Sequence, residues 1–165
     1  MMALPSGGAA MVCNTTDHPT DTTVVRALVD SMASLFIVND KRLLAQITNS
    51  SPEFTVETAD GAVPVNAMGT AFFYLRTKRG WQCFEVRNVL LIEKCPQVLY
   101  STRVMRDVYG FKHDIDGGSI TVPRLRGQAR TTVAVADDGV GFSTELAFAS
   151  APPSSAYHKH SDGLG

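Results

Sequence analysis

The chain has 165 residues, of which 44% are hydrophobic and 19% are charged, and its formal net charge is −1. This length supports one domain with a sizeable core and excludes two large ones. The near-neutral charge gives no electrostatic basis for nucleic-acid binding by the whole chain. No apolar run approaches the roughly 18 residues that span a bilayer. We therefore expect a globular domain with neither nucleic acid nor membrane as a partner.

Composition changes along the chain predict four regions. Residues 1–22 are rich in Gly, Ser, Thr and Asp and show no periodicity, which indicates a flexible segment, and they lack the pattern of a signal peptide. Residues 23–123 hold most of the β-type pattern and form the main predicted domain. Residues 124–150 add further strands to it. Residues 151–165 begin with Pro-Pro-Ser-Ser and are expected to be a disordered tail or linker.

Short runs rich in Val, Ile, Phe and Tyr, separated by turn residues, predict a mainly β fold. Alternation of apolar and polar residues, as in Phe54-Thr55-Val56-Glu57, is typical of strands with one solvated face. Asp60-Gly61 is a favoured pair for a tight hairpin. The predicted strands span residues 24–29, 35–38, 54–58, 63–66, 69–77, 81–92, 97–100, 110–115, 119–122, 131–136 and 142–148.

Only two segments carry a helical pattern. Residues 40–47 could form two turns with Asn39 or Asp40 as the N-cap, and residues 101–108 are the second candidate. The expected fold class is therefore mainly β, with one or two short helices.

The cysteine and histidine patterns predict no metal site and no cofactor. Cys13, Cys83 and Cys95 form no C-x-x-C pair, so we expect three free thiols in a reducing compartment. His158 and His160 are interpreted as residues of the tail. The chain contains neither a P-loop nor a dinucleotide-binding fingerprint.

Asp30 is the candidate catalytic residue. It ends an apolar run, residues 24–29, and is followed by Ser31, Met32 and small residues before the next apolar run. An acid on a tight turn after a buried strand is the way in which aspartic proteases present their carboxylate. Their loop reads Asp-Ser/Thr-Gly, whereas this chain has Met32 at the glycine position. An Asp-Ser pair at the end of a strand is also common as plain turn chemistry.

Taken in order, several segments resemble the protease region of Pol polyproteins from copia-type LTR retrotransposons. The resemblance covers roughly residues 24–122. Its segments are residues 27–34 (ALVDSMAS), 55–61 (TVETADG), 65–70 (VNAMGT), 86–92 (VRNVLLI), 98–101 (VLYS) and 109–111 (YGF).

The resemblance implies a small closed β-barrel of the retropepsin type that works as a homodimer. Asp30 would be the catalytic acid, and the hydroxyl of Ser31 would brace the loop against its dimer mate. Ala59, Asp60 and Gly61 would form the flap that closes over a polypeptide substrate, the element's own polyprotein. Residues 89–92 and 98–101 would pass beneath the catalytic loop. The implied location is the cytoplasm, including virus-like particles.

The chemistry explains why such a protein would dimerise. Two carboxyl groups about 3 Å apart cannot both ionise, so they share a proton and act as base and acid. A chain with one such loop must obtain the second Asp from a two-fold mate. In the motif, the glycine amide points toward the carboxylates where the loop packs closely. Met32 would overpack that space, so Met32→Gly is expected to raise proteolytic activity.

Two other functions remain open at the level of sequence. One is a catalytically inactive β-domain retained for self-association or scaffolding. The other is a small β-barrel with an unrelated binding role. Cleavage of a peptide library, blocked by an aspartic-protease inhibitor, separates the enzyme from the inactive domain.

Overall fold

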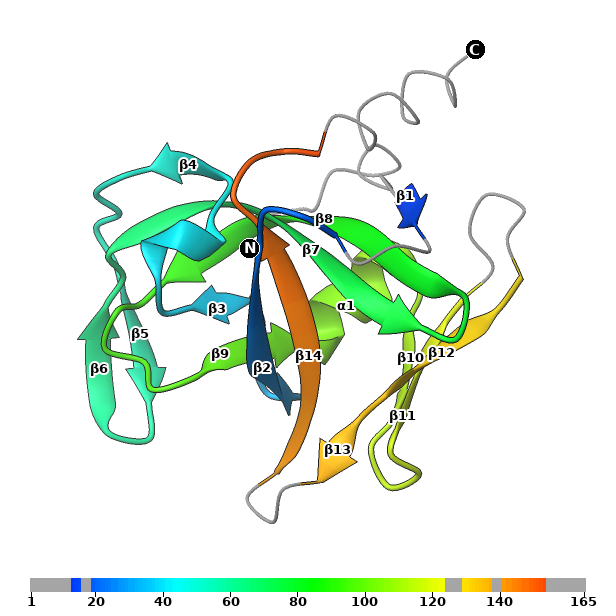
Figure 1. Ribbon diagram of the computed structural model, residues 1–165. Helices are drawn as coiled ribbons and strands as arrows, with labels where there is room; N and C mark the ends of the chain where they lie inside the picture. Colours follow the sequence, from blue (N-terminus) through cyan, green and yellow to red (C-terminus); the bar gives the residue numbers. More distant parts are fainter. Residues whose placement is uncertain (1–12, 16–18, 124–128, 138–140, 154–165) are drawn as a thin grey trace.

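A computed structural model describes residues 13–15, 19–123, 129–137 and 141–153. The predictions for residues 1–12 and for most of the tail, including His158 and His160, lie outside the described residues. The chain is mainly β with one short helix (Figure 1). The elements are β1 Cys13–Thr15, β2 Thr22–Asp30, β3 Ile37–Val38, the 3-10 helix η1 Lys41–Leu43, β4 Gln46–Asn49, β5 Thr55–Thr58, β6 Gly61–Pro64, β7 Ala67–Thr77, β8 Gly80–Leu91, β9 Val98–Ser101, α1 Thr102–Tyr109, β10 Lys112–Asp114, β11 Ser119–Val122, β12 Thr131–Ala134, β13 Ala136–Asp137 and β14 Phe142–Ala149.

Nine strands make one mixed sheet, in the order β1-β8-β3-β9-β2-β14-β7-β4, with β13 paired to β14. Because β7 also pairs with β8, the strands β8-β3-β9-β2-β14-β7 follow one another around a closed path. The result is ring-like but not barrel-shaped (Figure 1). Two smaller sheets stand beside the ring, a three-stranded one (β10-β11-β12) and the β5–β6 hairpin.

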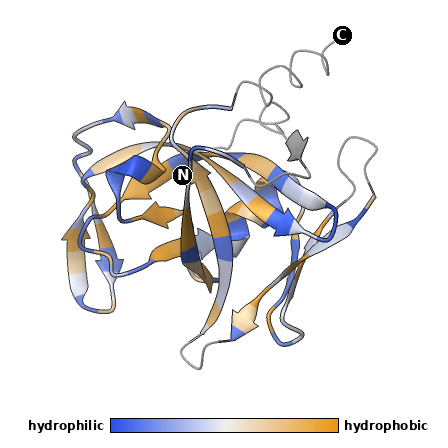
Figure 2. Ribbon diagram, viewed as in Figure 1, coloured by the Kyte–Doolittle hydropathy of each residue, from blue (hydrophilic) through white to orange (hydrophobic). Residues whose placement is uncertain are grey.

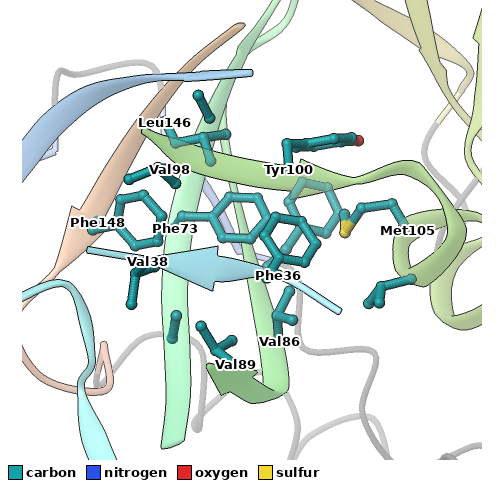
Figure 3. Close-up of a cluster of buried hydrophobic side chains, with 14 of the residues drawn as sticks. Phe36, Val38, Phe73, Val86, Val89, Val98, Tyr100, Met105, Leu146 and Phe148 are labelled. Atoms are coloured by element: carbon teal, nitrogen blue, oxygen red, sulfur yellow. The ribbon is translucent and has the colours of Figure 1, made fainter. Parts of the chain in front are cut away.

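The main core lies inside the ring and is built from aromatic side chains. Phe36 contacts Phe73 and Tyr100, with ring centroids 5.5 and 5.2 Å apart, and Phe73 also packs against Phe148 at 5.7 Å (Figure 3). These four residues come from the β3 region, β7, β9 and β14, so one cluster fastens four parts of the ring. Figure 2 shows apolar and polar residues alternating along the strands, as expected where one face of a strand meets the core.

The helix predicted for residues 101–108 is confirmed, with small shifts at its ends. α1 has Ser101 as its N-cap and ends at Gly110, which adopts a left-handed conformation with φ of 74°. Glycine tolerates that conformation because it has no Cβ.

The helix predicted for residues 40–47 is wrong beyond its first turn. Asp40 does act as an N-cap, since its carboxylate accepts the N–H of Arg42 at 2.9 Å. The turn is the short 3-10 helix η1, and the chain then continues as strand β4, paired with β7. A Cβ at Gly69 of β7 would collide with the backbone carbonyl of Gln46. Glycine at position 69 thus permits the strand pairing that replaces the helix.

Two of the cysteines belong to β-strands. Cys13 of β1 lies opposite Cys83 of β8 in the register of these strands, and Cys83 is buried. Cys95 is a free, half-buried thiol that donates to the carbonyl of Gln97 at 3.1 Å. The expectation of three free thiols stays a prediction. Among the described residues, no helix is long and apolar enough to cross a membrane.

Candidate functional site

Asp30 is the last residue of β2 and lies beside Ser101, the last residue of the parallel strand β9. Its carboxylate Oδ1 accepts a hydrogen bond from the backbone N–H of Met32, 2.8 Å away. The side chain is only half-buried. The expected direction of the residue-32 amide, toward the acid, is thus confirmed. The loop orients the carboxylate and leaves it accessible to solvent.

The loop after Asp30 crosses over β9. That strand runs parallel to β2 on one side and antiparallel to β3 on the other, where Ile37 pairs with Leu99. Residues 31–36 therefore connect two strands that are separated by β9 (Figure 1). This crossing places the loop at the end of the sheet, where its side chains can face outward.

Ser101 anchors this loop through a hydrogen bond. The sequence placed Ser101 in the segment 98–101 and at the start of the predicted helix, but gave it no role of its own. Its hydroxyl donates to the carbonyl of Ala33 at 2.7 Å and accepts the N–H of Val104 at 3.2 Å. Ser101 is fully buried. One hydroxyl group therefore ties the Asp30 loop to the first turn of α1. The sequence signal that could have identified it is a Ser at the very start of the predicted helix 101–108, because Ser is a typical N-cap.

Ser31 is exposed, and its side chain makes no hydrogen bond to the described part of the chain. It lines a cavity of about 530 Å³ together with residues of α1 and β10, among them Arg106, Lys112 and His113. The bracing contact expected of Ser31 is a contact to a dimer mate, so a single protomer does not test it.

The expectation that Met32 overpacks the loop is wrong for the protomer. The Met32 side chain is 85% exposed, the largest exposure of any large hydrophobic residue in the described ranges. The physical reason is the crossing at the end of the sheet, because there the backbone N–H turns inward to Asp30 while the side chain points to solvent. Any crowding by Met32 would have to involve a second molecule, so the higher activity expected of Met32→Gly loses its basis in the single chain.

Ala59, Asp60 and Gly61 do form the predicted tight hairpin, between β5 and β6. All three residues are exposed. The hairpin rests on a small apolar cluster through Val56 and Val63. Leu35 of the Asp30 loop packs against the same cluster. Within the described ranges, however, no hydrogen bond or ion pair joins the hairpin to that loop, so the structure does not bring Asp60 or Gly61 to Asp30.

His113 lies on β10, the edge strand of the three-stranded sheet, and its half-buried side chain packs next to the core. Its Nε2 is 3.0 Å from the hydroxyl of Tyr100, and the two rings pack edge to face. Burial, and to a lesser degree the charge of Arg106, lowers the pKa of His113 to about 4. Burial also raises the pKa of Tyr100 well above its ordinary value. At neutral pH the imidazole is uncharged, and its Nε2 can accept a hydrogen bond from the Tyr100 hydroxyl.

No group of three or more His, Cys, Asp or Glu side chains that could hold a metal ion occurs among the described residues. Comparison with known proteins returned no family model, no curated protein and no solved structure that matches this chain.

Proposed function

We propose that this chain is an aspartic-protease-like domain of a copia-type retrotransposon polyprotein, which cleaves that polyprotein as a homodimer. The observation that carries the proposal is the geometry at Asp30. The acid ends a core strand, accepts an amide of its own loop at 2.8 Å and stays open to solvent. The proposal includes the finer fold, in which the closed strand path is a variant of the retropepsin-type barrel.

The proposed mechanism uses two copies of Asp30. A two-fold axis next to the loop would bring the two carboxyl groups together, where they share one proton. The carboxylate then takes a proton from water, while the carboxylic acid polarises the scissile carbonyl. The Met32 amide and the Ser101 hydroxyl hold the loop in each protomer, which supports the fixed geometry that such a pair requires.

The site has two features that support a two-fold contact. Ser31 and Met32 are exposed and adjacent to Asp30. Met32 would bury its thioether side chain against a mate, and Ser31 would brace the neighbouring loop. Self-association and a polypeptide substrate are therefore the partners that we propose, within an intracellular compartment such as a virus-like particle.

The test is cleavage of a peptide library by the purified chain. We expect cleavage that an aspartic-protease inhibitor blocks and that Asp30→Asn abolishes, because the amide can neither give nor take the catalytic proton. Asp21→Asn, the same change at an exposed acid just before the opposite end of β2, is the control and should leave the rate within about twofold. Normal cleavage by Asp30→Asn at equal folding contradicts the assignment.

A second candidate function is a catalytically inactive domain retained for self-association. The observation that favours it is the exposed Met32 at the position where the protease motif has glycine. This candidate predicts a dimer without any cleavage, and an unchanged dimer in Asp30→Asn. The enzyme and the inactive domain are thus separated by activity, while both require association.

A further inference from the structure

On the side of the ring away from the β5–β6 hairpin, two neighbouring strands of the sheet separate from each other. Strands β7 and β14 are paired from Phe72 and Ala149 to Leu75 and Leu146. Beyond that point β7 continues beside β8, and β14 continues beside β2 and β13. A cleft of about 820 Å³ lies where the two strands part. Its lining residues belong mainly to β14, the end of β7, β12 and β13, elements that Figure 1 labels.

The cleft is lined by cations from three separate segments. Arg26 comes from β2, Arg76 from β7, and Lys78 from the turn that follows β7. Among the described residues, Glu145 of β14 is the one acid in the lining. Three cations and one acid give the cleft a net charge of +2 (3 − 1), although the whole chain carries −1.

These cations are available to a ligand. Arg76 and Lys78 are exposed and have no ion-pair partner in the part of the chain that the structure describes. Arg26 faces Glu145 at 3.5 Å, and the two side chains are 52% and 54% exposed. Arg26 also donates to the hydroxyl of Ser143 at 3.2 Å. An exposed pair at this separation contributes about 1 kcal/mol or less, so an incoming carboxylate can compete with Glu145 for Arg26.

The remaining lining indicates which kind of anion fits. Between the cations lie short hydroxyl side chains, such as Thr132 and Ser143, and small apolar ones, such as Val133 and Ala136. No aromatic side chain lines the cleft, so it offers no surface on which nucleic-acid bases could stack. The volume exceeds what one small anion requires, and the mixed polar and apolar walls can receive the varied side chains of a peptide.

We propose that this cleft binds an extended, acidic segment of a polypeptide, with its carboxylates paired to Arg76, Lys78 and Arg26. In an extended segment alternate side chains point the same way, so acids at every second position face one wall of the cleft. The hydroxyls and apolar residues receive the intervening side chains. This site is separate from Asp30, and its occupation does not depend on proteolysis.

The experiment is fluorescence anisotropy with a labelled octapeptide of alternating Glu and Thr, titrated with the full chain at low salt. The matched probe has Gln in place of every Glu. We expect the Gln peptide to bind at least tenfold more weakly. The double variant Arg76→Gln/Lys78→Gln should lose at least tenfold in affinity for the acidic peptide. Glu145→Gln should gain severalfold, because it releases Arg26.

The control variant is Lys41→Gln/Arg103→Gln, which removes the same two charges at exposed positions outside the cleft. It should bind within about twofold of the parent chain. Equal affinity for both peptides overturns the proposal, and so does an equal loss in the cleft and control variants. Tighter binding of an eight-nucleotide oligothymidylate, with the same loss on Arg76→Gln/Lys78→Gln, would assign the cleft to nucleic acid instead. All variants are at exposed side chains, and their thermal midpoints should match the parent.

Discussion

Ser101 carries two hydrogen bonds with one buried hydroxyl, to the Asp30 loop and to α1. Ser101→Ala removes both and leaves the Ala33 carbonyl and the Val104 N–H without this partner. We expect a loss of about 1–2 kcal/mol in the free energy of unfolding, measured by urea denaturation. Ser34→Ala is the control, because Ser34 is exposed in the same loop. A loss equal to that of the control would mean that Ser101 does not hold the loop.

His113 should make the fold sensitive to mild acid. Its pKa is about 4 in the folded chain, against an ordinary value of 6.5. The unfolded chain therefore takes up the proton first, so the stabilisation is present above pH 6.5 and is lost as the pH falls toward 4. Since the ring is partly exposed, we expect only about 1–2 kcal/mol.

The measurement compares urea denaturation at pH 7 and pH 4.5. The parent chain should lose about 1 kcal/mol more between these values than His113→Gln, which does not titrate. Equal losses in the two proteins would show that His113 titrates in the folded chain as it does in the unfolded one.

At the scale of elements, the same turn occurs twice. In Thr58-Ala59-Asp60-Gly61 and in Thr77-Lys78-Arg79-Gly80, the Thr hydroxyl donates to the Gly carbonyl at 2.8 Å. It also accepts the amide of the third residue, at 3.2 and 3.1 Å. Both glycines have positive φ, 109° and 107°. The two hairpins differ in what they support, since β7–β8 belongs to the ring and β5–β6 stands beside it.

This difference gives a paired prediction. Gly80→Ala should lower the global free energy of unfolding by about 1–2 kcal/mol, because alanine is strained at that φ and the hairpin is part of the ring. Gly61→Ala introduces the same local strain. We expect it to appear mainly as faster hydrogen exchange in β5–β6, with a smaller global loss. Equal global losses would show that the β5–β6 hairpin unfolds together with the ring.

The positions of the strands could be predicted from the local sequence pattern far better than which strands pair with each other. Runs of β-type residues predicted β2, β7, β8 and β11 to within two residues at each end. In β7 and β8 nearly every residue is buried, which explains why their apolar runs are almost continuous. The helical interpretation of residues 40–47 failed because the Gln46–Gly69 contact that favours β4 is not local. Strand β1 was missed for the same reason, since three residues of a turn-rich segment become a strand only against β8.

The same distinction holds for the site. The position of Asp30 at the end of a strand follows from a contiguous motif and could be predicted, whereas its catalytic role stays a prediction. The outward direction of Met32 could not be, because it depends on how the loop crosses β9. The cationic cleft was also missed, because Arg26, Arg76 and Glu145 are far apart in the chain. They line one cleft only in the folded sheet, at the point where the pairing of β7 with β14 ends.

For the whole molecule, we expect a concentration-dependent dimer in analytical ultracentrifugation at about 100 μM, the range in which an interface of about 6 kcal/mol is populated. Met32→Gly should weaken it by tenfold or more, because burying one Met side chain per protomer contributes about 1.5–3 kcal/mol. Phe54→Gly is the control, at an exposed hydrophobic residue outside the Asp30 loop. A strictly monomeric parent chain would contradict the protease and the association role alike.

The order of the strands in the ring has a consequence for how this chain folds. Strand β2 precedes both of its neighbours, β9 and β14, in the chain, and Leu28 pairs with both Leu99 and Ser143. Until β14, more than a hundred residues later, has been synthesised, one edge of β2 has no partner strand. Such distant pairings slow folding and favour association between nascent chains. We therefore expect this protein to depend on chaperones more than its size suggests.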